Sequence, residues 1–317
     1  MSIKMKNLLT HLQHPNSTKD YQAEDEPDAI KISEYWGRRT YQNQKPKISF
    51  ELFPPKSDSA NKLLKKTHQK LSEINPDYFS VTFGALGLSQ NDTFDTVADL
   101  SENTKIPIIP HLTCVGIDKK QVTDLLDEYI AQGVNQIMVL KGDYPKTIIK
   151  KGDFNYANEM VEFIKENYLD INILVAAYPE KHPHSNCIST DIDFFVNKVN
   201  AGADKAVTQY FYNIDAYLHF IEEVQKRNID IPITPGIMPI TNYDQLIYFS
   251  KACGAEIPAW ILNKLKLYKN DLNSLKEFGE DVVSEMCLKL KDNGVSSFHF
   301  YCLNKAEPTL SIVKKIT

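Results

Sequence analysis

From Lys47 to its C-terminus the chain alternates eight times between a short apolar stretch and a longer stretch whose apolar residues have helical spacing. The short stretches predict strands over residues 48–53, 78–83, 106–113, 136–140, 173–178, 205–211, 233–238 and 297–303. Eight strand–helix units in about 270 residues, joined by short connections, predict an α/β fold of the (β/α)8 TIM-barrel type in a single domain.

The stretches between and after these strands predict helices over residues 60–74, 92–102, 119–132, 156–168, 191–201, 214–227, 243–251, 259–267, 272–293 and 309–316. Three of them run into a glycine, the residue that most often ends a helix, at Gly133, Gly202 and Gly294. The boundaries of the helices are therefore marked by local chemistry as well as by periodicity.

An open, doubly wound sheet is the other fold that alternating strands and helices could form. Such a sheet usually carries a glycine-rich phosphate-binding turn after its first strand. Here Pro54 and Pro55 stand at that place, and the chain contains neither a GxGxxG nor a GxxxxGK[ST] motif. The sequence therefore favours the barrel and excludes nucleotide binding through such a turn.

The first 45 residues differ from the rest, because they are rich in polar residues and contain no strand-like run. We expect residues 1–45 to form a partly flexible N-terminal extension, with a helix over residues 29–39 that leads into the barrel. Residues 46–317 then form the catalytic barrel domain.

Composition excludes several kinds of partner. The net charge of −5 gives no reason to expect nucleic acid or an anionic membrane surface, and no apolar run is long enough to span a bilayer. The N-terminus lacks the apolar core of a signal peptide. The scattered cysteines predict reduced thiols in a cytoplasmic protein rather than disulfides or a cysteine-based zinc site, and they are Cys114, Cys187, Cys253, Cys287 and Cys302.

The first predicted strand contains a carboxylate among apolar residues. Residues 48–53 are apolar or small except for Glu51, and the run stops at two prolines that cannot continue a sheet ladder. A carboxylate in such surroundings is costly unless it is paired, protonated or used. Glu51 is therefore either a core residue paired with an Arg or Lys, or a general acid whose pKa is raised by its apolar neighbours.

Active sites of such barrels lie at the C-terminal ends of the strands. Polar or ionisable residues stand at seven of the eight predicted ends, and we expect them to meet at one wide mouth with room for a flat ligand. These residues are Glu51, Thr82, His111, Lys141, Asp143, Tyr178, Glu180, His182, Gln209, Tyr210, His299, Tyr301 and Lys305. Glu51 and Asp143 are the candidate catalytic carboxylates.

Eight motifs at these strand ends carry a family resemblance. In chain order they are FELFPP (residues 50–55), SVTFGA (80–85), PHLTC (110–114), KGD (141–143), AAYPEKHP (176–183), TQYFY (208–212), PGIMPI (235–240) and FHFYCLNKAE (298–307). From about Lys47 to the C-terminus the sequence resembles methylenetetrahydrofolate reductases of the bacterial, single-domain kind.

The resemblance implies an enzyme that holds FAD and takes electrons from NADH or NADPH. It would reduce 5,10-methylenetetrahydrofolate to 5-methyltetrahydrofolate, the methyl donor for methionine synthesis. We favour NADH, because the likeness is to enzymes without the large C-terminal regulatory domain of the eukaryotic reductases. We also expect a homo-oligomer.

The resemblance also implies roles for single residues. Glu51 matches the general acid that protonates N10 of the folate, so that the five-membered ring opens to a 5-iminium cation that accepts hydride. Asp143 matches an aspartate beside the flavin and the pterin, where its charge stabilises this cation. Four further positions match contacts to folate or nicotinamide, namely Gln209, Gln245, Phe249 and Lys305.

The positions that match FAD contacts are Thr82, Phe83, Ala85, His111, Lys141, Gly142, Asp143, Tyr156, Ala157, Tyr178, His182, Asp191 and Lys198. The chain departs from the family where Lys141 and Lys305 replace arginines, because Lys keeps the charge but loses the bidentate fork. Phe194 and Asn197 stand where polar or basic FAD contacts are usual.

Other interpretations of these residues remain open. His111 and His182 could be core histidines. Glu180, His182 and His184 invite a metal site, but a proline interrupts their spacing and we expect no metal. Lys141 could be the Schiff-base lysine of a barrel aldolase. The chain could also be a flavin- or folate-binding protein without catalytic activity.

Overall fold

The computed structural model describes residues 45–83, 90–142 and 152–317. The predicted extension, with its expected helix over residues 29–39, lies outside the described residues. So do two of the predicted site residues, Ala85 and Asp143.

Eight parallel strands form a closed barrel in chain order, which confirms the predicted (β/α)8 fold. The barrel closes where Lys47 to Glu51 of the first strand pair with Ser297 to Tyr301 of the last. The strands are β1 (Lys47–Leu52), β2 (Tyr78–Val81), β3 (Ile108–Thr113), β4 (Gln136–Leu140), β5 (Asn172–Ala177), β6 (Lys205–Tyr210), β7 (Ile233–Ile237) and β8 (Ser297–Tyr301).

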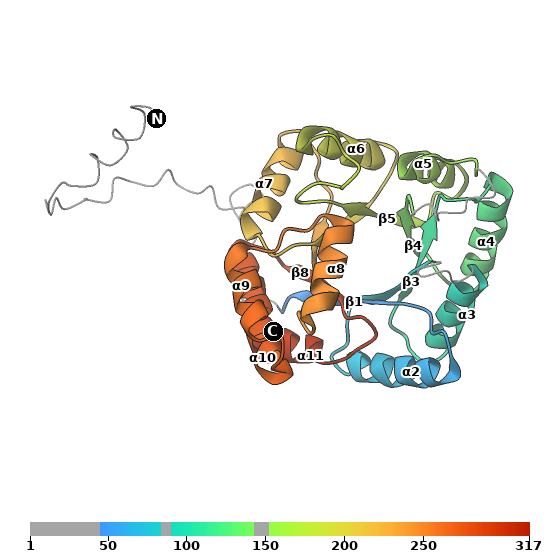
Figure 1. Ribbon diagram of the computed structural model, residues 1–317. Coiled ribbons are helices and arrows are strands. Elements are labelled where there is room, and N and C mark those ends of the chain that lie inside the picture. The colour runs from blue at the N-terminus through green and yellow to red at the C-terminus, as the bar shows by residue number, and fades with distance from the viewer. Residues whose placement is uncertain (1–44, 84–89, 143–151) are drawn as a thin grey trace, which may run out of the picture.

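A ring of helices surrounds the strands (Figure 1). They are α2 (Asp58–Ser72), α3 (Gln90–Ser101), α4 (Lys119–Ala131), α5 (Ala157–Asn167), α6 (Ile188–Asn200), α7 (Ile214–Gln225), α8 (Tyr243–Cys253), α9 (Ala259–Leu267), α10 (Leu272–Asp292) and α11 (Thr309–Ile316). None of the helices in the described ranges is long and apolar enough to span a membrane.

Local chemistry fixes the ends of several helices. Before α4, the Asp118 side chain accepts a hydrogen bond from the Gln121 backbone, and the Gln121 side chain accepts one from the Asp118 backbone. The glycines predicted to end helices have positive φ angles, 83° at Gly133, 114° at Gly202 and 89° at Gly294. These glycines therefore end their helices in the left-handed conformation, as the sequence predicted.

Some strand ends differ from the prediction for clear reasons. Strand β8 ends at Tyr301 rather than at residue 303, because Leu303 and Asn304 have φ angles of 52° and 53°, which a strand cannot contain. Strand β3 begins at Ile108 rather than at residue 106, since Pro107 has no N–H to donate. Strand β2 is two residues shorter than predicted at its C-terminal end.

The core consists of two layers separated by the sheet. Outward-facing strand residues such as Phe50 and Phe79 pack against the helices. Alternate residues face the barrel interior, where Tyr78, Ile109, Met138, Leu174 and Val207 form a separate apolar cluster. Glu51 and Ser49 occupy alternate positions on β1 and therefore face this interior.

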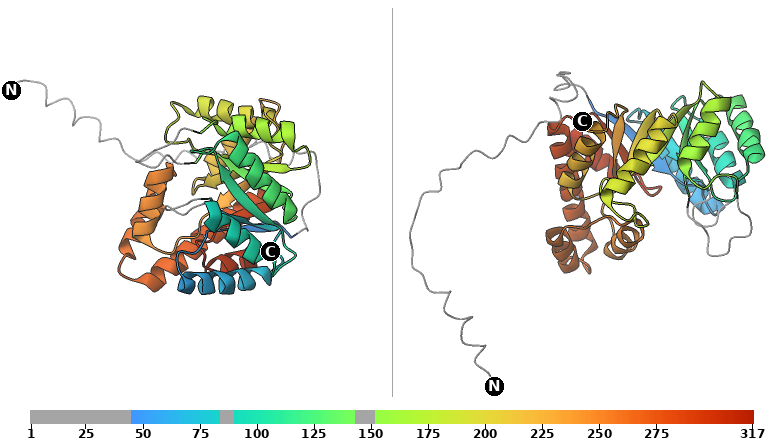
Figure 2. Two further views of the ribbon diagram at one scale, coloured as in Figure 1. Left: turned by 90° about the vertical axis from the view of Figure 1, so that its right-hand side faces the viewer. Right: turned by 90° about the horizontal axis from the view of Figure 1, so that it is seen from above.

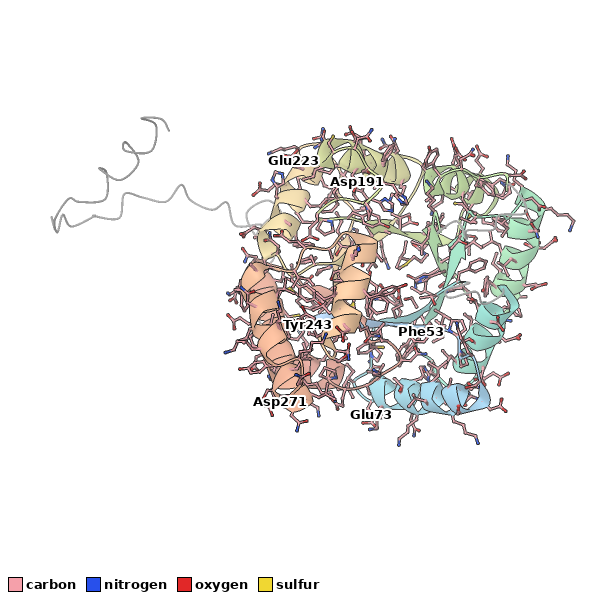
Figure 3. The ribbon with its side chains drawn as sticks, viewed as in Figure 1. Phe53, Glu73, Asp191, Glu223, Tyr243 and Asp271 are labelled. Atoms are coloured by element: carbon pink, nitrogen blue, oxygen red, sulfur yellow. The ribbon has the colours of Figure 1, made fainter. Side chains whose placement is uncertain are left out.

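Helix α8 departs from the regular ring. It lies inside the ring in Figure 1, and Figure 2 shows it standing out beyond one end of the barrel. Because α8 follows β7, this is the end at which the strands terminate. Figure 3 labels Tyr243 at the start of α8 and Phe53 just after β1 on the inner side of the ring, whereas Glu73, Glu223 and Asp271 lie on its rim.

Candidate active site

Glu51 stands near the C-terminal end of β1 with its side chain in the barrel interior. Only 22% of this side chain is exposed. Burial in this space raises the pKa of Glu51 to about 8, because a carboxylate loses its hydration there. The carboxyl group is therefore mostly protonated at neutral pH and can give a proton.

An ionisable neighbour of this carboxyl is His111 on β3, whose Nε2 lies 3.8 Å from Oε2 of Glu51. Burial lowers the pKa of His111 to about 3, so both groups are uncharged near pH 7. Within the described part of the chain, no Lys or Arg forms an ion pair with Glu51. This arrangement argues against the alternative that Glu51 is a core residue paired with a cation.

A second polar layer lies beneath Glu51. Oγ of Ser49 lies 2.8 Å from Nδ1 of His299, which is fully buried. The His299 ring stacks on Tyr78 at 5.6 Å and meets the edge of Tyr301 at 5.4 Å. The Tyr301 hydroxyl donates to the carbonyl of Thr208 at 2.7 Å. The prediction put His299 at the mouth, but the structure places it below the mouth.

A buried polar atom and a tightly packed glycine lie at the ends of β2 and β4. Thr82 Oγ1 is buried and has no partner among the described residues. A Cβ on Gly142 would lie 2.8 Å from Cβ of Thr113, and Gly142 has a φ of 80°. The ammonium group of Lys141 lies 4.8 Å from the centre of the Tyr156 ring. Lys141 is exposed, so it lacks the burial that activates a Schiff-base lysine.

The loop after β5 is fixed by its own hydrogen bonds. The backbone N–H of His182 and the hydroxyl of Ser185 both donate to the carboxylate of Asp191, at 2.9 and 2.7 Å. The ring of His182 meets that of Tyr178 edge-on at 4.8 Å. Among the residues with described positions, no three His, Cys, Asp or Glu side chains are grouped to hold a metal.

Lys198 on α6 reaches back toward the same strand. Its ammonium group donates to the carbonyl of Ala176. Burial lowers the pKa of Lys198 to about 8, against an opposing effect of the Asp191 charge. Two predicted cofactor positions, Asp191 and Lys198, therefore lie together at the end of β5.

The end of β6 is irregular. The pairing of β6 with β7 shifts between Val207 and Tyr210, and Oε1 of Gln209 accepts from the backbone of Tyr210 at 3.0 Å. Gly236 on β7 lies against this bulge, since a Cβ there would be 2.1 Å from the carbonyl of Thr208. The bulge aims Gln209 into a small pocket, which is lined by Tyr178, Pro179, Glu180, Lys181, Gln209, Tyr210, Cys253, Gly254 and Ala255.

Helix α8 carries the predicted residues Gln245 and Phe249, both half-buried. Its C-terminal end is tied to the loop after β5, because Oε2 of Glu180 accepts from the backbone of Glu256 at 2.9 Å. Burial raises the pKa of Glu180 to about 7. Glu180 therefore has a structural role in holding α8 over the mouth.

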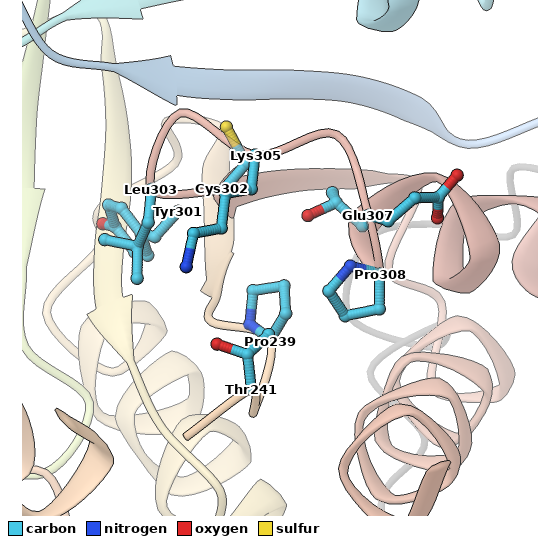
Figure 4. Close-up of a pocket in the computed structure, with 9 residues that line it drawn as sticks. Pro239, Thr241, Tyr301, Cys302, Leu303, Lys305, Glu307 and Pro308 are labelled. Carbon is cyan, nitrogen blue, oxygen red and sulfur yellow. The ribbon is translucent and has the colours of Figure 1, made fainter. Parts of the chain in front are cut away.

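Lys305 lies in a second pocket at the ends of β7 and β8 (Figure 4). Its ammonium group points toward Pro239 and Thr241, while the carboxylate of Glu307 points away. Other residues that line this pocket are Tyr301, Cys302, Leu303, Pro308 and Thr309. Lys305 therefore offers a positive charge near the ends of β7 and β8, whereas Lys198 lies against the end of β5.

The described site residues thus come from β1 to β6, α5, α6, α8 and the segment after β8. Sequence reasoning placed Thr208 at the end of the sixth strand but did not foresee its contact with Tyr301, and it did not single out Ser49, which contacts His299. Ser49 could have been found, because it lies two residues before Glu51 and therefore on the same face of the strand.

Comparison with known proteins agrees with this geometry. The family described as "Methylenetetrahydrofolate reductase" matches residues 37–317. A "5,10-methylenetetrahydrofolate reductase" of Buchnera aphidicola subsp. Schizaphis graminum is 38% identical, with 85% of this chain and 91% of the relative covered. The enzyme of the same name from Escherichia coli is 33% identical, with 84% and 88% covered.

A plant relative and a solved structure extend the comparison. "Methylenetetrahydrofolate reductase (NADH) 1" of Arabidopsis thaliana is 30% identical over 85% of this chain but only 48% of the relative. A solved protein from Clostridium thermocellum, titled as binding two copies of 5-methyl-5,6,7,8-tetrahydrofolic acid, superimposes with a TM-score of 0.60 at 17% identity, covering 87% of this chain and 96% of that one. The fold, the mouth and the relatives agree: the chain belongs to the methylenetetrahydrofolate reductase family of oxidoreductases.

Proposed function

We propose that this protein holds FAD and uses NADH or NADPH to reduce 5,10-methylenetetrahydrofolate to 5-methyltetrahydrofolate. The observation that carries the proposal is a largely protonated carboxyl group, Glu51, at the barrel mouth without a cationic partner among the described residues. This reaction needs an acid that keeps its proton at neutral pH.

The residues at the mouth fit a bound flavin dinucleotide. Thr82 Oγ1 is a buried polar atom that a ligand could satisfy, and Gly142 packs closely against Thr113 beside it at the strand ends. Lys141 and Lys198 offer positive charge for phosphates. Further contacts would come from Phe83, Ala85, His111, Asp143, Tyr156, Ala157, Tyr178, His182 and Asp191. When bound, the flavin would carry hydride from the nicotinamide to the folate.

Glu51 would give its proton to N10 of the folate. Protonation lets the N10–methylene bond break, so that the five-membered ring opens to a 5-iminium cation. Asp143 would stabilise this cation through its negative charge. Glu51 is left as a carboxylate and regains a proton from solvent through its exposed edge.

The remaining residues would orient the substrates. Gln209 would align the pterin or the nicotinamide, while Gln245 and Phe249 on α8 would contact them from above the mouth. Lys305 would attract the anionic part of the folate. The folate ligand named for the Clostridium protein, on the same barrel, supports a folate substrate here.

The name of the Arabidopsis relative supports NADH as the reductant. The product would supply methyl groups for methionine synthesis. We further propose a homo-oligomer in the cytoplasm, where the described cysteines, all of which are free thiols, would stay reduced.

The absorption spectrum of the purified protein tests this function. We expect a yellow protein that bleaches with NADH or NADPH and recovers its colour with methylenetetrahydrofolate. A colourless protein that borohydride traps with a carbonyl substrate would instead support an aldolase. A yellow protein that does not turn over would support a binding protein without activity.

A further inference from the structure

Buried polar atoms without partners gather around Glu51. Eight side chains in the described ranges have such an atom, and four of them belong to Ser80, Thr82, His111 and His299. These residues stand on β8, β2 and β3 or directly after β2, while Glu51 stands on β1 between β8 and β2. A buried polar atom without a partner is costly, so this concentration calls for a ligand.

The contacts of His299 fit one of its two neutral tautomers. The Ser49 hydroxyl has one proton, which it donates to the carbonyl of Phe298 at 3.4 Å. This donation fits a tautomer in which His299 donates the 2.8 Å contact from its Nδ1 to Ser49. Burial keeps this ring neutral, so in that tautomer Nε2 carries no proton and can only accept a hydrogen bond.

His111 provides a second such atom. Its Nε2 has no partner among the described residues and lies 3.8 Å from the Glu51 carboxyl, too far for a direct hydrogen bond. His111 is close enough to His299 for its charge to lower the pKa of that ring. Ser80, which pairs with Glu51 in the sheet register, adds a hydroxyl donor.

We propose that one ordered water molecule binds between Ser80 Oγ, His111 Nε2 and His299 Nε2, and that it selects the acid form of Glu51. In this proposal both rings carry their proton on Nδ1, so that the water donates its two hydrogens to the two Nε2 atoms and accepts from Ser80 and from the Glu51 hydroxyl. Four hydrogen bonds satisfy a buried water molecule completely. Because both hydrogens of this water are donated to the histidines, it cannot donate a hydrogen bond to an ionised Glu51. It can only accept one from the protonated form.

His299 is thus a positioning residue, which acts on Glu51 through the water. Among the described residues, three other titratable groups interact with the carboxyl, and they are uncharged at neutral pH. Burial raises the pKa values of Tyr78 and Tyr301, and that of Cys302 to about 12. Hydrogen bonding to the water would therefore add to the effect of burial on Glu51, with no contribution from a neighbouring charge within the described residues.

Two substitutions separate the two nitrogens of His299. His299→Asn keeps an amide near Nδ1 for Ser49 but has no atom at Nε2, whereas His299→Gln places its amide near Nε2. His68→Asn on α2 is the matched control, since this buried histidine also has an Nε2 without a partner in the described chain but packs against Phe79 on the outer side of the sheet.

The first readout is the protonation of Glu51 itself, followed by the infrared carboxyl band that Glu51→Gln removes. We expect its midpoint to fall by about one pH unit in His299→Asn, a tenfold change typical of one lost hydrogen bond. The midpoint should move little in His299→Gln and His68→Asn. An unchanged midpoint in His299→Asn, or an equal shift in His68→Asn, would overturn the proposal.

The second readout is the water molecule in a high-resolution crystal structure of the purified protein. We expect it within hydrogen-bond distance of both Nε2 atoms in the parent and its loss in His299→Asn. A dry space in the parent would overturn the proposal. The role of Glu51 as acid rests on the proposed function, but neither readout requires turnover, so the two can fail separately.

Discussion

At the scale of single residues, the chemistry of this site depends on Glu51 keeping its proton. The free carboxyl of a glutamate would be almost fully ionised at pH 7. Burial in the barrel raises the pKa of Glu51 to about 8, and His111 and His299 beside it stay neutral because burial lowers both of their pKa values to about 3. An uncharged layer thus surrounds the proton donor.

This arrangement predicts the pH dependence of folate reduction. The acid form is the active form, so the rate should be flat below about pH 7 and fall tenfold per unit above the pKa of about 8. Stopped-flow reoxidation of the pre-reduced enzyme by methylenetetrahydrofolate measures this rate. A rate that stays constant up to about pH 9.5 would mean that the acid is another group.

The sequence revealed Glu51 but could not decide its role. The strand pattern placed a carboxylate among Phe50, Leu52 and Phe53, and both a paired core residue and a general acid fitted that pattern. The choice between these two roles depends on which side chains surround Glu51. These include His111 from β3 and Tyr301 from β8, which are distant from it in the sequence. Local pattern cannot predict such contacts.

At the scale of elements, the strands and helices follow the sequence closely. Periodicity located each strand to within about two residues. The boundary after β1 shows what local pattern misses. Pro54 and Pro55 end the strand, and the amide of Asn304, which follows β8, bonds both the N–H and the carbonyl of Phe53, at 3.0 and 2.8 Å. The prolines are visible in the sequence, but their distant partner is not.

The bulge of β6 makes a further prediction about Gly236. A Cβ there would lie 2.1 Å from the carbonyl of Thr208 and 2.6 Å from the Tyr301 ring. Gly236→Ala should therefore lower the free energy of unfolding by about 3 kcal/mol or more, since neither neighbour can move freely. Urea unfolding followed by circular dichroism measures this loss.

Gly133→Ala is the matched control for that measurement. Gly133 has a φ of 83° but no atom within 4 Å of the added Cβ, so only backbone strain of about 1 kcal/mol is expected. If Gly236→Ala cost no more than Gly133→Ala, the close approach of β6, β7 and Tyr301 would be refuted.

At the scale of the whole molecule, the barrel interior links stability to pH. The pKa of His299 is about 3 in the folded protein, below its ordinary value of 6.5. Between these two values the His299 side chain is protonated in the unfolded chain but not in the folded protein. The free energy of unfolding therefore falls as the pH drops from 6.5 toward 3. Glu51 has the opposite effect, because its raised pKa means that the folded protein holds a proton that the unfolded chain has lost. The free energy of unfolding therefore falls as the pH rises from 4.5 through 8.

His299→Gln tests this linkage, because glutamine does not titrate. Between about pH 6.5 and pH 4 the unfolding free energy of His299→Gln should fall less than that of the parent. The slope of unfolding free energy against pH should differ by the contribution of about one bound proton. Urea midpoints at several pH values provide the comparison. Parallel curves for the two proteins would show that His299 already takes up a proton in the folded state.

The barrel as a whole was predictable, because eight repeated units admit few arrangements. The position of α8 was not. Periodicity identified the helix, but its place over the mouth depends on the tie between Glu180 and Glu256 and on the contact of Gly254 with Lys181 and Pro183. These are tertiary contacts between loops, which no local signal encodes.

The central claim is that one flavin serves two half-reactions and that only the second needs the Glu51 proton. Glu51→Gln keeps the shape and hydrogen bonding of the side chain but has no acidic proton. Glu180→Gln is the control, because Glu180 is another buried carboxyl whose pKa is raised, to about 7, but it holds a loop.

The most direct measurement is stopped-flow absorbance of both half-reactions in these two variants. Glu51→Gln should be yellow, should be reduced by NADH within a few-fold of the parent rate, and should reoxidise with methylenetetrahydrofolate about 10² to 10⁴ times more slowly. Glu180→Gln should reoxidise within a few-fold of the parent rate. Normal reoxidation of Glu51→Gln by the folate would contradict the claim, and loss of folding or of FAD in that variant would assign Glu51 a structural role instead.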